Sequence, residues 1–291
     1  MNTLLKPEVL NSIAQLELTA RLIAEGYMSG SSRSQSVGPA QVFSQYRNYE
    51  AGDDLRQLDW KMYARSERYF IKQSDIESNI TVKFMLDATA SMNYSEDGIS
   101  KLQYAKILIA SLGWLARKQG DALGFYAVNG RSVSTLPPRF EQQHFMRFLA
   151  TLIDVGGADR WANASLLYDH HGKELIIFFT DLYDEDRDLQ HFIGRLKTNR
   201  NEVVVFQLIG KKELDLSFGG TVTFKDLETG RLLEVDTVSE QQRYKVAMND
   251  WISSSRKWML EKQIYFYPVT MDQATATVLR DFLNVRKKLI R

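Results

Sequence analysis

The sequence predicts an α/β protein built on a doubly wound, mostly parallel sheet. From residue 80 onward, stretches with the character of strands take turns with stretches that have helical spacing. Two strand-like runs, Leu175–Phe179 and Val203–Ile209, are apolar apart from Gln207, which is typical of parallel strands covered on both faces. Repetition of strand and helix in this way favours one open sheet with helices on its two sides.

An amino-terminal extension over residues 1–78 is expected to pack on the main domain. In order, it should contain a helix over residues 8–25, a Ser/Gly/Pro-rich loop over 29–39, an extended stretch over 41–49 and a strand over 69–72. Asp53 or Asp54 is placed to cap a short helix, and the buried side of that helix would contain Leu55, Leu58 and Met62.

The main domain is expected to span residues 79–291. Its predicted strands cover residues 80–86, 122–128, 133–136 at an edge, 175–179, 203–209 and 263–269, and its predicted helices cover 101–119, 140–153, 187–198 and the stretch from 273. A β-hairpin insertion over residues 213–236 interrupts this order, with strand-like runs at 214–218, 222–224 and 232–235 and a turn at Glu228-Thr229-Gly230.

Composition restricts the possible functions. The chain has 291 residues with 37 Lys and Arg against 36 Asp and Glu, so its charge gives no reason to expect a nucleic acid partner. There are no cysteines, which excludes disulfides, thiolate metal sites and cysteine nucleophiles. The longest apolar stretch, Ile107–Ala116, is too short to span a bilayer, and Met1–Leu10 does not resemble a signal peptide. We therefore expect a cytoplasmic protein without membrane insertion.

The most informative segment is the predicted strand Ile80–Leu86 and the polar residues that follow it. Asp87, Thr89 and Ser91 present one carboxylate and two hydroxyls at alternate positions after the strand. Ligands collect outside the carboxyl ends of strands in open α/β sheets, and hard cations prefer oxygen ligands. Asp181 follows the predicted strand 175–179 and should lie at the same edge, although it could instead cap the next helix, as Asp184 or Asp186 could.

Asp87-Ala-Thr-Ala-Ser91 resembles the first loop of the metal-ion-dependent adhesion site of von Willebrand factor A domains, usually Asp-x-Ser-x-Ser. The resemblance implies a von Willebrand factor A-like fold that binds Mg²⁺ or Mn²⁺ weakly. The second loop of that family usually offers Gly-x-Thr-Asp, whereas this chain has Gly156-Gly-Ala-Asp159. Ala158 stands in place of the threonine, so Asp159 or a water would have to replace the hydroxyl. The ligands implied are Asp87, Thr89, Ser91, Asp181 and Asp159.

A second resemblance is carried by the segment from Tyr46 to Trp60 and by Ala64-Arg65. It is similar to the signature of the DUF58 family, Arg-x-Tyr-x-x-Gly-Asp-Asp-x-Arg-x-Ile-Asp-Trp-x-x-x-Ala-Arg. The matching residues include Arg47, Tyr49, Gly52, Asp53, Asp54, Arg56, Asp59, Trp60 and Arg65. Later family positions are Lys101, Gly120-Asp121 and Phe224-x-Asp-x-Glu-Thr-Gly230. The charged segment could contact a partner, or it could form a salt-bridge and capping network that fastens the amino-terminal region to the sheet.

DUF58 proteins are similar to von Willebrand factor A domains and are commonly encoded beside AAA+ ATPases of the MoxR class. The resemblance implies a non-enzymatic binding module or adaptor that acts with a MoxR-type AAA+ ATPase and an unknown client protein. The alternative is a metal-dependent hydrolase that uses Asp87, Asp181 and Asp159 to activate water. The sequence has neither a nucleotide-binding Gly-x-x-x-x-Gly-Lys loop nor a Gly-x-Ser-x-Gly elbow, and it offers no candidate base with a defined partner, which favours binding.

Overall fold

The computed structural model describes residues 12–32, 46–49, 58–72, 80–130, 132–141, 143–161, 173–183 and 188–289. The chain divides into two compact units, one of residues 1–28 and 80–291 and one of residues 29–79. Helix α1 (Ile13–Ser32) belongs to the larger unit up to Met28, and its Leu16, Ala20 and Ala24 are buried in the main core. Packing of the whole extension on the main domain stays a prediction.

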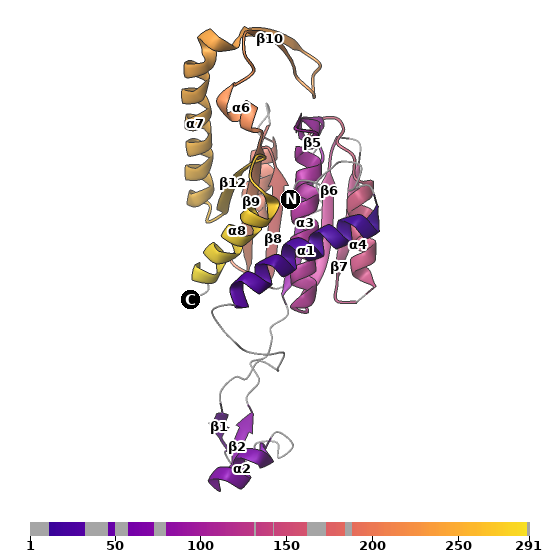
Figure 1. Cartoon of the computed structure of the whole chain (residues 1–291), viewed down its shortest axis with the longest axis vertical. Coiled ribbons are helices and arrows are strands. Elements are labelled where there is room, and N and C mark those ends of the chain that lie inside the picture. The colour runs from indigo at the N-terminus through magenta and orange to yellow at the C-terminus, as the bar shows by residue number, and fades with distance from the viewer. Residues whose placement is uncertain are drawn as a thin grey trace. The chain divides into compact units, whose positions relative to one another are not determined.

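A six-stranded sheet forms the centre of the larger unit in the described part of the chain (Figure 1). Its strands are β3 (Thr81–Asp87), β6 (Ala122–Val128), β7 (Val133–Arg139), β8 (Glu174–Thr180), β9 (Asn201–Ile209) and β12 (Tyr265–Thr270), in the spatial order β12-β9-β8-β3-β6-β7. Neighbouring strands are parallel except the pair β6–β7. The predicted doubly wound, mostly parallel sheet is confirmed.

The order of the strands reverses between β3 and β8. The chain passes from β3 to β6 and β7 on one side, and then returns to β8, β9 and β12 on the other. Leu86 of β3 pairs with Phe179 of β8, so Asp87 and Asp181 both follow at the same edge. This confirms their predicted common edge and places it at the topological switch point, where open α/β sheets bind ligands.

Two apolar layers cover the sheet. One contains buried side chains of α1, α3 (Lys101–Lys118), α4 (His144–Asp154) and α8 (Thr275–Leu289). The other contains those of α5 (Asp188–Leu196) and the end of α7 (Thr237–Glu261). Phe84 faces the first layer and Met85 the second, as expected from the alternation of side chains along a strand.

Aromatic rings dominate the first layer. The Phe148 ring is fully buried, with its centroid 5.6 Å from that of Phe84 and 5.8 Å from those of Phe125 and Phe145. Gly113 allows α3 to approach α4 at this point, because a Cβ there would lie 2.9 Å from Cε1 of Phe148. The Phe148 cluster thus packs α4 against β3, the strand that ends in Asp87.

The insertion differs in part from the prediction. Strands β10 (Thr221–Lys225) and β11 (Leu232–Asp236) form the expected antiparallel hairpin. The stretch 214–218, expected as a strand, instead overlaps the short helix α6 (Lys211–Asp215), because Glu213 accepts a hydrogen bond from the Gly210 amide and completes a helical cap. Helix α7, which follows the hairpin, was not predicted. Only Thr237 and Met259 are buried along it, so most of its side chains lie outside the two apolar layers.

The smaller unit pairs β1 (Tyr46–Asn48) with β2 (Phe70–Lys72) in an antiparallel ladder. Helix α2 (Trp60–Ser66) is capped by Asp59, whose carboxylate accepts hydrogen bonds from the amides of Lys61 and Met62 at 2.9 and 3.2 Å. The predicted cap was therefore wrong, and Asp53 and Asp54 themselves lie outside the described residues. Short elements near the site are η4 (Ala90–Asn93), β4 (Ser95–Glu96) and β5 (Ile99–Ser100). Among the described helices, none has the length and apolar character needed to cross a membrane.

Phe148→Ala should lower the free energy of unfolding by about 3–5 kcal/mol, because it leaves a cavity among three other aromatic rings. Met146→Ala is the matched control, since Met146 lies on the same helix with 44% of its surface exposed and should cost under about 1 kcal/mol. Urea denaturation followed by circular dichroism measures both. Equal costs for the two variants would show that the cluster does not anchor α4.

Candidate functional site

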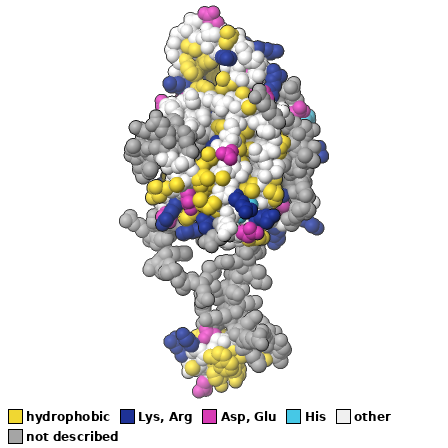
Figure 2. All heavy atoms as spheres, turned by 90° about the vertical axis from the view of Figure 1, so that its right-hand side faces the viewer, with side chains coloured by type: hydrophobic (Ala, Val, Ile, Leu, Met, Phe, Trp, Pro, Cys, Tyr) yellow, Lys and Arg dark blue, Asp and Glu magenta, His cyan; other side chains and the backbone are white. Residues whose placement is uncertain are grey.

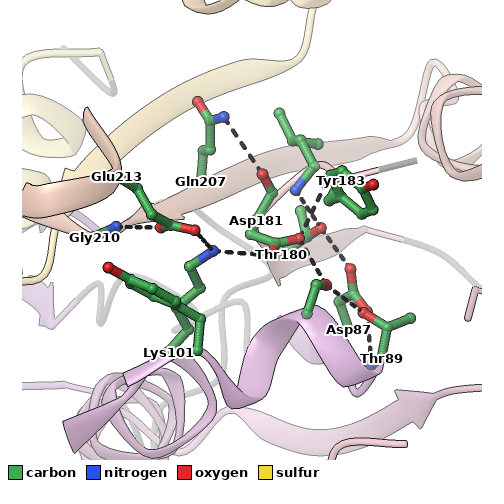
Figure 3. A network of polar contacts seen from close by, with 12 residues as sticks. Asp87, Thr89, Lys101, Thr180, Asp181, Tyr183, Gln207, Gly210 and Glu213 are labelled. Carbon is green, nitrogen blue, oxygen red and sulfur yellow. Dashed lines mark hydrogen bonds and ion pairs between the residues drawn. The ribbon is translucent and has the colours of Figure 1, made fainter. Parts of the chain in front are cut away.

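The candidate site lies at the carboxyl ends of β3 and β8 (Figure 3). Asp87 is the last residue of β3, and Asp181 follows the last residue of β8 directly. The hydroxyl residues Thr89 and Ser91 come from the loop that follows β3, and η4 turns this loop across the strand ends. The structure therefore brings together four of the five predicted metal-ligating residues.

Asp87 is completely buried at the base of the site. Its Oδ2 accepts a hydrogen bond of 2.7 Å from the Thr180 hydroxyl, and its Oδ1 accepts one of 3.0 Å from the Thr89 amide. Burial, together with the negative charge of Asp181, raises the pKa of Asp87 to about 7 despite these hydrogen bonds. An ionised Asp87 is thus costly in this environment unless positive charge lies nearby.

The two hydroxyls connect the Asp87 loop to Asp181. Thr89 Oγ1 and Ser91 Oγ lie 3.0 Å apart, and Ser91 Oγ donates to Asp181 Oδ1 at 3.3 Å. The same Asp181 oxygen accepts a hydrogen bond from the Tyr183 amide at 3.1 Å. Asp181 therefore closes its own loop as well as holding Ser91.

A buried lysine is the cation of the site. Lys101 Nζ lies 3.0 Å from Asp181 Oδ2 and 2.9 Å from Glu213 Oε1, and 5% of the lysine side chain is exposed. Burial acts to lower the pKa of Lys101, but the charges of Asp181 and Glu213 outweigh it and raise that pKa. Lys101 stays protonated, and it joins the end of β8 to α6. The sequence marked it only as a family position.

Glu228 reaches the site from the turn of the hairpin. Asp226 Oδ1 accepts hydrogen bonds from the amides of Glu228 and Thr229 at 2.8 and 3.1 Å, which fixes the turn. Burial and the charge of Asp181 raise the pKa of Glu228 to about 7, while the hydroxyls of Ser91 and Thr89 act to lower it. Its Oε1 is buried without a hydrogen-bond partner.

Sequence reasoning treated Glu228 only as a turn residue. The available signal was its position in Phe224-x-Asp-x-Glu-Thr-Gly230, a stretch that already resembled the family. Neither spacing nor periodicity could place this turn against a loop more than a hundred residues earlier in the chain.

The loop with Asp159 meets the Asp87 loop through its main chain. The Ala158 amide donates to the Ala88 carbonyl at 2.9 Å, and the Ala90 amide donates to the Asp159 carbonyl at 2.8 Å. Asp159 has a left-handed backbone with φ of 55°. It packs closely against Gly130, because a Cβ added to Gly130 would lie 3.0 Å from the Cβ of Asp159. A role for the Asp159 carboxylate as a metal ligand stays a prediction.

The signature residues belong to the smaller unit. Gly52, Asp53, Asp54 and Arg56 lie outside the described residues, as does the side chain of Arg47. Trp60 and Arg65 are exposed on α2. Tyr63 and Tyr69 stack at 4.6 Å, and Tyr49 meets Tyr69 edge-on at 6.2 Å. Of the signature residues, Asp59 therefore caps a helix, and Tyr49 joins an aromatic cluster with Tyr63 and Tyr69.

The donor atoms fit a hard divalent cation in kind. Carboxylates of Asp87, Asp181 and Glu228 and hydroxyls of Thr89 and Ser91 form a set of oxygen donors only, which suits Mg²⁺ or Mn²⁺. Within the described ranges, no three or more His, Asp or Glu side chains are grouped closely enough to hold a metal ion. A cation here would therefore use hydroxyls and one or two carboxylates and keep several waters.

A groove of about 1410 Å³ opens beside these residues. Ser91, Lys101 and Asp181 line it on the side of the strand ends. Phe224 and Leu233 line it from the hairpin, and Met248 and Trp251 line it from α7. The polar edge is thus continuous with a largely apolar surface.

A family profile with the description "Protein of unknown function DUF58" matches residues 45–254. The chain belongs to this family. The predicted membership is confirmed. Uncharacterised proteins of Mycobacterium bovis and Mycobacterium tuberculosis are 23% identical to this DUF58 chain over 235 residues, which cover 78% of it and 74% of each relative.

Solved structures similar to this DUF58 chain include a conserved hypothetical protein, BatB, from Bacteroides thetaiotaomicron. It is 14% identical, with a TM-score of 0.44, over 72% of this chain and all of that one. A von Willebrand factor type A protein from Catenulispora acidiphila is 12% identical, with a TM-score of 0.38, over 71% of this chain and 42% of that one. These similarities concern the fold alone.

Asp87→Asn should change how stability depends on pH. In the unfolded chain the Asp87 carboxyl ionises near its ordinary pKa of 3.8, whereas in the fold it ionises only near 7. The wild type should therefore lose stability as the pH rises between those values, and the variant should not. In chelator-treated buffer, we expect the melting temperature of Asp87→Asn minus that of the wild type to grow by several degrees from pH 4 to pH 8. Glu141→Gln, which removes an exposed carboxylate, is the control, and its melting temperature should differ from that of the wild type by the same amount at every pH. A difference for Asp87→Asn that does not change with pH would contradict the raised pKa of Asp87.

Lys101→Met should lower the free energy of unfolding by about 3–5 kcal/mol, because it leaves two carboxylates without their buried cation. Lys211→Met is the matched control. Its ion pair with Asp215 has side chains that are 48% and 30% exposed, so its loss should cost under about 1 kcal/mol. Guanidinium denaturation at pH 7 measures the free energy of unfolding of both variants. A similar loss of stability in the two would show that the ion pairs of Lys101 do not stabilise the fold.

Proposed function

We propose that this chain is a non-enzymatic protein-binding module that docks a partner at the strand-end edge, defined as Asp87, Thr89, Ser91 and Asp181. The observation that supports the proposal is the convergence of two hydroxyls and two carboxylates at the switch point of the sheet, where α/β proteins bind ligands. The groove next to the edge provides apolar surface for the rest of the contact.

A divalent cation suits the edge because the carboxylates carry more negative charge than Lys101 compensates. Bound Mg²⁺ or Mn²⁺ would offer a coordination position to a carboxylate of the partner. Thr89 and Ser91 would hold the cation through their hydroxyls, while Asp87 and Asp181 would orient those hydroxyls through the loop and supply charge. Such a contact is directional and modest in strength, as an adaptor that exchanges partners requires.

Hydrolysis is less well supported, although carboxyl groups with a raised pKa also occur in catalytic sites. Asp87 has no exposed surface, and both of its oxygens accept hydrogen bonds within the protein. Lys101 stays protonated between two carboxylates. The Lys101 ammonium has no lone pair to take a proton from a bound water, and Asp87 has no exposed surface at which such a water could reach it.

The partner we propose is a MoxR-type AAA+ ATPase, as the family resemblance implies, with the client protein as a second partner. A surface apart from the edge could carry the contact instead. Hydrophobic side chains gather at the end of the larger unit where the hairpin lies (Figure 2), and Leu232 and Leu233 on β11 are 69% and 65% exposed. The test must therefore separate the edge from the hairpin.

Calorimetry with a MoxR-type ATPase from the same organism tests the proposal in buffer with Mg²⁺. We expect Ser91→Ala to weaken binding at least about tenfold, which corresponds to about 1.4 kcal/mol, because it removes a hydroxyl that faces the cation. EDTA should weaken binding by the wild type to a similar degree. Glu141→Gln is the control for an exposed polar change.

Leu232→Ser with Leu233→Ser tests the hairpin in the same experiment. If these changes abolish binding while Ser91→Ala and EDTA leave it unchanged, the strand-end edge is not the docking site, and the module binds through its hairpin. If none of the variants changes the affinity, neither the strand-end edge nor the hairpin carries the contact.

A further inference from the structure

The smaller unit carries a row of aromatic rings that we call the aromatic face: Tyr49, Trp60, Tyr63 and Tyr69. The ring centroid of Tyr63 lies 6.3 Å from that of Trp60 and 4.6 Å from that of Tyr69, and the Tyr49 ring lies 6.2 Å from Tyr69. Trp60 is 61% exposed and Tyr69 is 47% exposed. Hydrophobic side chains with basic ones beside them are visible on this unit (Figure 2). Single exposed apolar residues are common, but a contiguous exposed group marks an interaction site.

Main-chain contacts and a helix cap hold the aromatic face in place. The Tyr49 amide donates to the Tyr69 carbonyl at 3.0 Å, and the Asp59 amide donates to the Phe70 carbonyl at 2.9 Å. Asp59 also caps α2, so this helix begins at a fixed place. The rings of Tyr63 and Tyr69 stack with an angle of 12° between their planes. The face is therefore ordered before a partner arrives, which lowers the entropy cost of binding.

Positive charge lies beside the aromatic face. The exposed charged side chains over residues 60–69 are one carboxylate and three cations, namely Glu67, Lys61, Arg65 and Arg68. Three positive charges against one negative charge give this segment a net charge of +2. The carboxylate of Asp59 is buried and engaged by the amides at the start of α2. Because the whole chain has a net charge of only +1, the excess is local, and it complements negative charge on a partner.

The residue types on this surface are those of a protein interface. Trp, Tyr and Arg are the types most enriched among the side chains that contribute most binding energy between proteins. Arg65 and Arg68 can pair with carboxylates in a bidentate way, while apolar side chains of the same segment cover the Trp60 ring. An acidic segment that also carries apolar side chains therefore matches both parts of this surface.

Two other negatively charged surfaces fit less well. Nucleic acid binding depends on an extended basic surface and on ring faces open to bases, whereas this chain has balanced charge and Tyr63 and Tyr69 each cover one face of the other. Basic clusters that bind anionic lipids typically contain about four to eight Lys and Arg, and residues 60–69 contain three.

We infer that the aromatic face docks an acidic segment of a partner protein, with Trp60 covered by apolar side chains and Arg65 and Arg68 paired with carboxylates. The inference goes beyond the proposed function, because this contact belongs to the smaller unit and needs neither a divalent cation nor the strand-end edge. It also gives a binding role to three residues of the family signature, Tyr49, Trp60 and Arg65.

Fluorescence anisotropy with synthetic peptides tests the docking surface on the full chain in buffer with EDTA. One set of short labelled peptides contains Asp, Glu, Leu and Phe in varied order, and the matched set has Lys in place of Asp and Glu. We expect the wild type to bind peptides of the acidic set in preference to the basic set, and Trp60→Ala to weaken that binding at least about tenfold. Phe140→Ala is the matched control, since Phe140 is 64% exposed on the larger unit, and it should bind as the wild type does.

Charge reversal provides a second readout. Arg65→Glu combined with Arg68→Glu changes the net charge of residues 60–69 from +2 to −2, so the preference should switch from the acidic to the basic peptides. Lys257→Glu combined with Lys262→Glu changes the charge of the whole chain equally at exposed positions of the larger unit, and it should keep the preference of the wild type.

Four results would overturn the inference. The first is that the acidic peptides bind no better than the basic ones, and the second is that Trp60→Ala binds them as the wild type does. The third is tighter, Trp60-dependent binding of single-stranded oligonucleotides or of phosphatidylserine vesicles, which would assign the face to nucleic acid or to a membrane. The fourth is a melting temperature of Trp60→Ala clearly below that of Phe140→Ala, because it would show that the Trp60 ring packs within the protein.

Discussion

The buried ammonium of Lys101 is the contact on which the rest of the site depends. It joins Asp181, at the end of a central strand, to Glu213 in the insertion, 80 and 112 residues further along the chain. Taking these charges out of water is costly, and only close pairing compensates for that cost. The lysine itself is placed by the start of α3, where Ser100 and Gln103 form a reciprocal capping box. The beginning of one helix therefore fixes the carboxylate at the end of a strand and the first turn of the insertion.

The insertion is attached to the strand-end edge by a series of polar contacts. Glu96 accepts hydrogen bonds from the amides of Lys211 and Lys212 at the start of α6, at 2.9 and 2.8 Å. Glu213 and Asp226 add the contacts to Lys101 and Tyr183. These contacts concentrate carboxylates around one lysine, so the edge carries an excess of negative charge. This excess favours positively charged ligands at the edge.

Much of this arrangement could be predicted from the sequence, for identifiable physical reasons. The runs Leu175–Phe179 and Val203–Ile209 are apolar because both faces of a parallel sheet are covered, and that character also fixed the common edge of Asp87 and Asp181. Helix α7 escaped prediction because polar residues dominate its sequence, while its Met248 and Trp251 line the groove and are not buried in the core. Leu214, Leu216 and Phe218 alternate as in a strand, but the Glu213 cap at Gly210 starts a helix first. The local sequence pattern could not decide between a strand and a helix in this stretch.

Glu228 could not be placed from the sequence because its environment depends on the direction in which the hairpin leaves the sheet. That direction follows from contacts of α6 and Asp226 with distant loops, none of which has a signature in spacing. The predicted cap of α2 was wrong for a different reason. Asp53, Asp54 and Asp59 are chemically equivalent as caps, and only the observed start of the helix selects Asp59.

The hydrogen bonds at the strand-end edge also show which of its oxygens are already engaged and which remain available to a ligand. Asp181 Oδ1 accepts from Ser91 and from the Tyr183 amide, and Oδ2 accepts from Lys101, so both of its oxygens are already engaged. Ser91 gives its hydroxyl hydrogen to Asp181 and therefore accepts that of Thr89, which leaves one lone pair of its Oγ available to a ligand. Asp181 therefore acts as a positioning residue that orients Ser91, whereas the hydroxyl oxygens of Ser91 and Thr89 have capacity left for a ligand. An edge whose carboxylates are occupied and whose hydroxyl oxygens are available suits a weakly held cation better than it suits proton transfer.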